Sequence, residues 1–88
     1  MVKRELESQK IQIFGAMWCS DCVRAKRFLD EHKLAYNWHD VTVDATAMAY
    51  VQRINNGMKS IPTILFMDGA ILVEPSNRQL ARKLGITE

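Results

Sequence analysis

Cys19 and Cys22 are separated by only two residues and lie where a short strand-like run passes into a helical pattern. At this spacing the two side chains meet across the first turn of a helix, where they can close a disulfide. The helix N-terminus offers partial positive charge and unpaired amide N–H groups to a sulfur placed there. Both favour the thiolate, which is the form of cysteine that attacks disulfides. The pair therefore predicts dithiol redox chemistry.

The two cysteines have different expected roles. Cys19 is nearer the helix start and is the candidate nucleophile. The alternative interpretation is that Cys19 is a small hydrophobic residue buried in the core. Cys22 lies one turn further along, on the apolar stripe of the helix. We interpret it as the resolving thiol, a role that is compatible with a place in the core.

Size and composition restrict the class of protein. The chain has 88 residues, of which 48% are apolar, and a net charge of +2, so we expect one small domain over residues 1–88. Residues 1–10 are charged and lack the apolar core of a secretory signal. No apolar run approaches the roughly 18 residues that span a bilayer. We expect a cytoplasmic monomer that binds neither nucleic acid nor a membrane.

The first half of the chain supplies the elements around the cysteines. Residues 11–14 alternate apolar and polar and end at Gly15, which predicts a strand. Residues 34–39 predict a second strand, with Tyr36 and Trp38 in the core. Between them, residues 20–32 predict a helix whose apolar stripe is Cys22, Ala25 and Leu29, with Phe28 beside it.

The second half begins with a helix that Asp44 caps and that ends at residues 55–57, Asn-Asn-Gly. Its expected inward face is Ala47, Val51 and Ile54. Residues 63–67 and 70–73 then predict a hairpin, joined by a two-residue Asp68-Gly69 turn.

A last helix follows the hairpin. Ser76 and Gln79 match a capping box, Leu80 and Leu84 are expected to be buried, and Gly85 ends the helix. The order β-α-β-α-β-β-α predicts an α/β fold with a mixed four-stranded sheet and helices on both faces. The first two strands should be parallel, through a right-handed crossover.

This order, with Trp18-Cys19-Ser20-Asp21-Cys22 after the first strand and Ser60-Ile61-Pro62-Thr63 opening the third, resembles the glutaredoxin branch of the thioredoxin superfamily. Within that branch it looks most like the mycoredoxins and related small glutaredoxin-like proteins. The resemblance covers residues 11 to 85 and leaves the first ten as an extension. A CxxC pair alone is common, but together with a downstream Ile-Pro-Thr at this distance it is specific.

The resemblance implies a thioredoxin-like fold in which the peptide bond before Pro62 is cis and lies beside the cysteines. It implies that the Ile61 backbone pairs with a low-molecular-weight thiol held in mixed disulfide with Cys19. Ser76 and Asn77 would then receive the carboxylate or amino end of that thiol, since a helix N-terminus is a ready anion site. Trp18, Ser20 and Asp21 complete the expected binding surface.

Two departures from the glutathione-dependent members leave the thiol open between glutathione and mycothiol. Residues 73–77 carry no Gly-Gly pair followed by an acidic residue, and residues 15–17 supply no lysine before Cys19. Asn77 in place of a carboxylate would weaken recognition of the charged amino group of glutathione.

Several side chains have two interpretations. Asp21 either tunes Cys19, with Arg24 offsetting its charge, or is a solvated acid of the first helical turn. Trp18 either shields the disulfide and contributes to docking or is simply packed. His32 and His39 do not have the spacing of a zinc pair, so we expect no metal. The cluster Arg24, Lys26 and Arg27 is most simply a solvated helix face.

The leading hypothesis is a thiol–disulfide oxidoreductase that reduces protein disulfides, or mixed disulfides between proteins and a small thiol, with no bound cofactor. An alternative within the same chemistry is a redoxin reduced directly by a flavoprotein reductase. A [2Fe–2S] cluster carrier is an alternative of another class, and brown colour on anaerobic purification would reveal it. A non-catalytic interaction domain would require cysteines inert to iodoacetamide.

Overall fold

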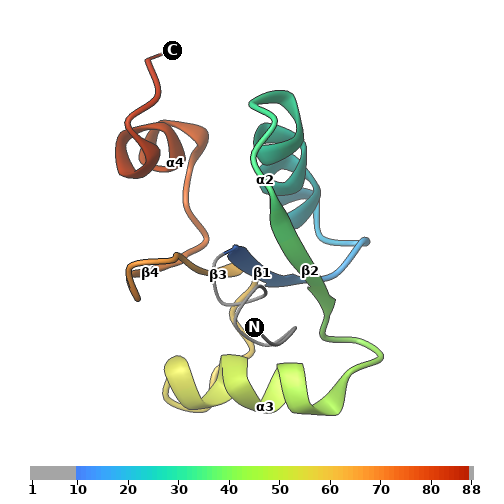
Figure 1. The fold of residues 1–88 in the computed structure, drawn as a ribbon. Helices are drawn as coiled ribbons and strands as arrows, with labels where there is room; N and C mark the ends of the chain where they lie inside the picture. Colours follow the sequence, from blue (N-terminus) through green and yellow to red (C-terminus); the bar gives the residue numbers. More distant parts are fainter. Residues whose placement is uncertain (1–9, 88) are drawn as a thin grey trace, which may run out of the picture.

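The computed structural model describes residues 10–87, so all but the last residue of the expected N-terminal extension lies outside the described part. Three helices and four strands follow one another in the expected order β-α-β-α-β-β-α (Figure 1). No helix within residues 10–87 is long and apolar enough to cross a membrane. The elements are β1 (Ile11–Gly15), α2 (Ser20–Glu31), β2 (Tyr36–Asp40), α3 (Ala45–Ile54), β3 (Thr63–Leu65), β4 (Ile71–Val73) and α4 (Asn77–Leu84).

The strands form one mixed sheet in the order β2-β1-β3-β4. β1 is parallel to β2, with Gly15 opposite Asp40, and antiparallel to β3, with Phe14 opposite Thr63. β4 extends the sheet as the antiparallel partner of β3. The fold is therefore the predicted thioredoxin-like arrangement, with β1 at its centre.

Helices cover both faces of this sheet: α2 and α4 lie on one side and α3 on the other (Figure 1). Successive side chains of a strand point to opposite faces, so Ile11 and Ile13 of β1 enter the α2/α4 layer while Phe14 enters the α3 layer. The larger core cluster is Ile11, Ile13, Ala25, Phe28, Leu29, Ile64, Phe66, Leu80 and Ala81. The smaller is Phe14, Val41, Ala47 and Val51.

The second strand begins two residues later than predicted, because the end of α2 uses the residues before it. Lys33 adopts a left-handed conformation, with φ 56°. The Lys33 N–H donates to Asp30 O, and the Leu34 N–H donates to Leu29 O. This is a Schellman closure, which commonly carries glycine and is therefore hard to predict at a lysine.

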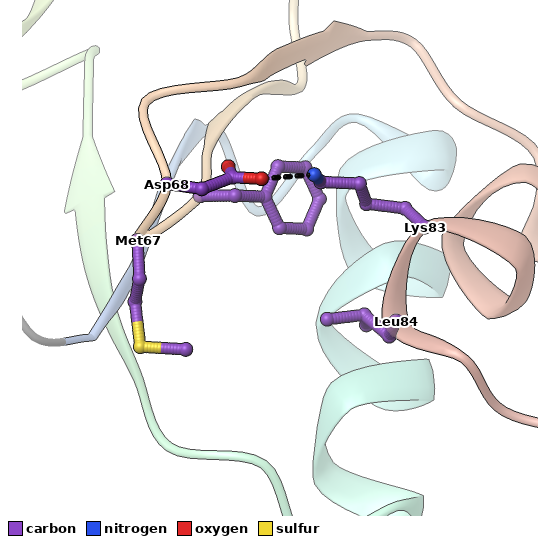
Figure 2. Close-up of a pocket in the computed structure, with 5 residues that line it drawn as sticks. Met67, Asp68, Lys83 and Leu84 are labelled. Atoms are coloured by element: carbon purple, nitrogen blue, oxygen red, sulfur yellow. Dashed lines mark hydrogen bonds and ion pairs between the residues drawn. The ribbon is translucent and has the colours of Figure 1, made fainter.

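The predicted two-residue hairpin turn is wrong: the loop has three residues, Met67, Asp68 and Gly69. The Gly69 N–H donates to Phe66 O, and the Phe66 N–H donates to Ala70 O. Gly69 supplies the positive φ, 88°, that this longer loop requires. Asp68 then pairs with Lys83 of α4 at 2.5 Å, and the Lys83 ammonium lies 5.5 Å from the Phe66 ring centroid. Asp68 and Lys83 both line a pocket of about 200 Å³ (Figure 2).

Some residues predicted to be in the core are only half-buried. Tyr36 and Trp38 pack against the larger cluster, but the Lys26 ammonium lies 5.8 and 5.9 Å from their ring centroids. β2 is an edge strand, so one side of each ring remains open to such a cation. Ile54 and Leu84 are likewise half-buried, whereas Phe66 is buried.

Candidate active site

Cys19 occupies the N-cap position of α2. Its backbone is extended, with φ −89° and ψ 114°, and its Sγ accepts a hydrogen bond from the Cys22 N–H at 3.3 Å. The Cys19 N–H in turn donates to Ala16 O, which fixes the approach to the helix. The sulfur therefore lies at the positive end of the helix dipole and is partly exposed. This is the position that suits an attacking thiolate.

Cys22 lies one turn further along and is fully buried, with 0% of its surface exposed. Burial raises the pKa of the Cys22 thiol to about 12, and its hydrogen bond with Cys19 acts in the same direction, whereas the Ala16 backbone opposes them. The two thiols are thus chemically unlike: one is accessible at a helix terminus, and the other holds its proton within the core.

Gly15, which the sequence indicated only as the end of a strand, leaves space for the Cys22 side chain. A Cβ at Gly15 would lie 2.7 Å from Cys22 Sγ and 3.1 Å from Cη2 of Trp38. Side-chain carbons do not approach other atoms so closely, so only glycine lets β1 pass beside the buried thiol. The Trp38 ring and the Cys22 side chain therefore both border the space next to Gly15.

Replacing Gly15 by alanine should destabilise the fold by about 1–3 kcal/mol, the usual cost of overpacking a close-packed core. The measurement is the free energy of unfolding by chemical denaturation. In a Cys22→Ala background the sulfur is gone, so the same Gly15→Ala change should cost less. Equal costs in the two backgrounds would show that the contact with Cys22 does not set the penalty.

The loop before β3 reaches the same edge of the sheet. The Ile61–Pro62 peptide bond is cis, as the resemblance implies. Because Phe14 pairs with Thr63 in an antiparallel register, Pro62 lies level with Gly15, just before the loop that carries Cys19. The buried Thr63 hydroxyl donates to Ser60 O at 2.7 Å, which ties the loop that contains Pro62 to the first residue of β3.

Ile61 is half-buried, and within residues 10–87 its backbone N–H and C=O take no hydrogen-bond partner. The neighbouring Pro62 carbonyl differs, because it accepts a hydrogen bond from the Glu74 N–H at 2.8 Å. One peptide-like group could therefore add to the Ile61 backbone in the manner of an extra strand.

The start of α4 lies beside the cysteine helix α2. Ser76 is its N-cap, and the capping box with Gln79 is formed as predicted. Arg24 of α2 reaches across to this segment: it donates to Asn77 Oδ1 at 2.8 Å and to Pro75 O at 3.1 Å. The expectation of a solvated Arg24 is therefore wrong. No local sequence signal indicated this contact, because the partners are more than fifty positions apart.

The other expected site residues are exposed. Ser20 and Asp21 lie in the first turn of α2, and the exposed Asp21 carboxylate lies 3.4 Å from Arg24, so a tuning effect on Cys19 stays a prediction. Trp18 leaves 76% of its surface in solvent, and Met17 beside it leaves 58%. Simple packing of Trp18 is thus excluded, and an apolar side chain is left accessible next to Cys19.

The ring contacts and hydrogen bonds of the two histidines are with residues other than the cysteines. His32 packs against Phe28, while His39 stacks on Phe14 and lies 2.6 Å from Gln12 Oε1. Within the described residues no three His, Cys, Asp or Glu side chains form a group that could hold a metal ion.

Comparison with known proteins agrees with this geometry. The glutaredoxin family model matches residues 11–71. A Mycobacterium tuberculosis protein assigned to the glutaredoxins is 32% identical over 74 residues, which is 84% of this chain and 88% of that protein. Mycoredoxin 1 of Corynebacterium glutamicum is 27% identical over 74 residues, 84% of this chain and 91% of the relative.

Solved structures show the same fold. A thioredoxin-like protein superimposes with a TM-score of 0.78 at 29% identity, covering 90% of this chain and 99% of its own. A buckwheat glutaredoxin in complex with glutathione superimposes with a TM-score of 0.66 at 15% identity, covering 94% and 78%. With a family model matched over most of its length and a cysteine pair at the start of α2, the chain belongs to the glutaredoxin family of thiol–disulfide oxidoreductases.

Proposed function

We propose that this protein reduces mixed disulfides between proteins and a low-molecular-weight thiol, and more slowly disulfides within proteins. The observation that carries the proposal is the contrast between the two cysteines: Cys19 is accessible at a helix N-terminus, and Cys22 is fully buried beneath it. Only Cys19 can meet an incoming disulfide without a change in the fold.

In the first step the Cys19 thiolate attacks one sulfur of the substrate disulfide. A new S–S bond forms at Cys19 Sγ, and the other substrate sulfur leaves with the electron pair as a thiolate. The Cys22 N–H that donates to Cys19 Sγ stabilises negative charge on the attacking atom before the bond forms.

The resulting mixed disulfide has two ways to resolve. A second small thiol can attack it, which restores the Cys19 thiol and releases a disulfide of two small thiols. Alternatively Cys22 loses its proton and attacks Cys19, which releases the bound thiol and leaves a Cys19–Cys22 disulfide. Cys22 is buried and holds its proton in the free protein, so it has to lose that proton before the second route can proceed.

The small thiol would lie between the Ile61 backbone and the start of α4. The unpaired Ile61 backbone offers a hydrogen-bond pair to an amide of the thiol, while Ser76 and Asn77 offer a helix N-terminus to its far end. A relative named mycoredoxin supports mycothiol. The absence of an acidic residue at position 77 likewise speaks against recognition of the amino group of glutathione.

Replacing Cys22 by serine tests the division between the two routes. The variant should keep most activity on a peptide–small-thiol mixed disulfide, because a second small thiol can still resolve the intermediate. It should lose at least about tenfold on a protein disulfide, where no small thiol has been brought to the site. Both substrates are assayed in parallel with glutathione, mycothiol and flavoprotein-reductase recycling.

Parallel recycling also separates the sources of electrons. Turnover supported by a small thiol is the expected result. If turnover occurs only with the flavoprotein reductase, the protein is a directly reduced redoxin and the small-thiol part of the proposal is wrong. Equal loss of both activities in Cys22→Ser would overturn the assigned roles.

A further inference from the structure

Arg24 joins the helix that carries the cysteines to the helix that completes the thiol site. One terminal nitrogen of its guanidinium donates to Asn77 Oδ1 at 2.8 Å. The other donates to Pro75 O at 3.1 Å and lies 3.4 Å from an Asp21 carboxylate oxygen. The side chain is 35% exposed, so part of its charge is shielded from water.

These contacts determine which way the Asn77 amide faces. Arginine carries donors only, so the amide oxygen must be the atom that turns toward Arg24. The amide nitrogen then points away from Arg24 and presents two N–H donors. An asparagine held this way binds a hydrogen-bond acceptor, such as a carboxylate or a carbonyl, and does not bind an ammonium group.

The segment that holds Asn77 is fixed from two sides. The Glu74 N–H donates to Pro62 O, and Glu74 itself adopts a positive φ of 51°. Arg24 then holds the next residue, Pro75, through its carbonyl. The Pro62 loop and the cysteine helix therefore meet at the start of α4, and Arg24 supplies the link from the cysteine side.

We infer that Arg24 is a positioning residue that sets the Asn77 amide as a donor and thereby selects small thiols whose far end is a hydrogen-bond acceptor. The inference rests on the proposed function, because it concerns the same thiol site. Arg24 acts through Asn77 and the start of α4, and it takes no part in the bond exchange at Cys19. Its loss should therefore weaken the binding of the mixed disulfide without slowing the attack.

The test measures kcat and KM for a synthetic peptide–glutathione mixed disulfide and for the same substrate with the glutathione amino group acetylated. Acetylation replaces an ammonium by an acceptor carbonyl. Wild type should have a lower KM for the acetylated substrate. In Arg24→Met the KM for that substrate should rise about tenfold, the factor of one hydrogen bond of about 1.4 kcal/mol, while kcat changes less than about twofold.

Two further variants keep the result specific. Arg24→Lys keeps the charge but offers a point donor in place of a fork, so its KM should lie between wild type and Arg24→Met. Arg27→Met is the matched control, because Arg27 is an exposed arginine of the same helix, and its KM should equal that of wild type. The rate of Cys19 alkylation should be the same in all three.

A double-mutant cycle tests whether Arg24 acts through Asn77. In an Asn77→Ala background the Arg24→Met change should raise KM by less than about twofold further, because its target is already gone. Full additivity, an unchanged KM in Arg24→Met, or a loss confined to kcat would each overturn the inference. If wild type fails to turn over these two substrates and a peptide–mycothiol mixed disulfide as well, the proposed function fails instead.

Discussion

Replacing Cys19 by serine should abolish every thiol–disulfide exchange, with a loss of more than about 10³-fold, the scale on which removal of a catalytic nucleophile acts. The serine hydroxyl has its ordinary high pKa and stays protonated at pH 7, so it is a far weaker nucleophile than a thiolate. The remaining Cys22 cannot take over, because it is fully buried and holds its proton. The measurement is the initial rate of mixed-disulfide reduction at pH 7.

The Cys19→Ser protein should remain folded, since its hydroxyl can still accept the Cys22 N–H as an N-cap. Its thermal melt is therefore the control for a structural cause. Residual activity within tenfold of wild type in a folded Cys19→Ser protein would show that Cys22 attacks substrate directly, and the order of the two cysteines would have to be reversed.

In the same Cys19→Ser protein, alkylation of Cys22 by iodoacetamide should be very slow near neutral pH and should rise about tenfold per pH unit, without a plateau up to pH 10. Burial, the largest cause that raises the pKa of Cys22, is still present in this variant, so very little of the thiol is ionised at pH 7. Cys19 in Cys22→Ser, which is partly exposed, should react much faster. A plateau for Cys22 below pH 10 would contradict this assignment.

The same raised pKa makes the fold sensitive to alkali. The folded-state pKa of about 12 lies above the ordinary value of 9.0, so the folded protein binds the Cys22 proton more tightly than the unfolded chain does. The contribution to stability is full below pH 9 and is lost as pH rises through 12. Tyr36, whose pKa burial also raises to about 12, contributes in the same direction. A Cys22→Ala protein, which retains Tyr36, therefore isolates the cysteine's share.

The architecture was accessible from sequence because its elements carry local signals. The capping residues Asp44 and Ser76 accept the expected backbone N–H groups, and Gly85 ends α4 in a left-handed conformation. The errors are equally local. Lys33 takes the left-handed position of a helix end that is usually occupied by glycine, and the three-residue loop at Gly69 contains the same Asp-Gly pair as a two-residue turn. In both cases one sequence is compatible with two backbone solutions that differ by one or two residues.

The site was accessible only in part. The cysteines and Pro62 stood in recognisable patterns, but the contacts that organise them are tertiary. Arg24 looked like any charged residue on a helix face until α4 was placed beside it, and Gly15 looked like a strand end until Cys22 was placed against it. Neither role is marked by a periodicity or a spacing in the sequence, because each depends on how two separately predicted elements pack together.

The central place of β1 has a consequence for the growing chain. Its partner β2 follows after a single helix, but its other partner, β3, is made only after α3. Until then one edge of a strand with buried Ile11, Ile13 and Phe14 has its hydrogen-bonding groups unpaired. Such an edge is a template for pairing with other chains. The last third of the protein contains no cysteine, yet its strand β3 covers that edge and removes this template from the folded molecule.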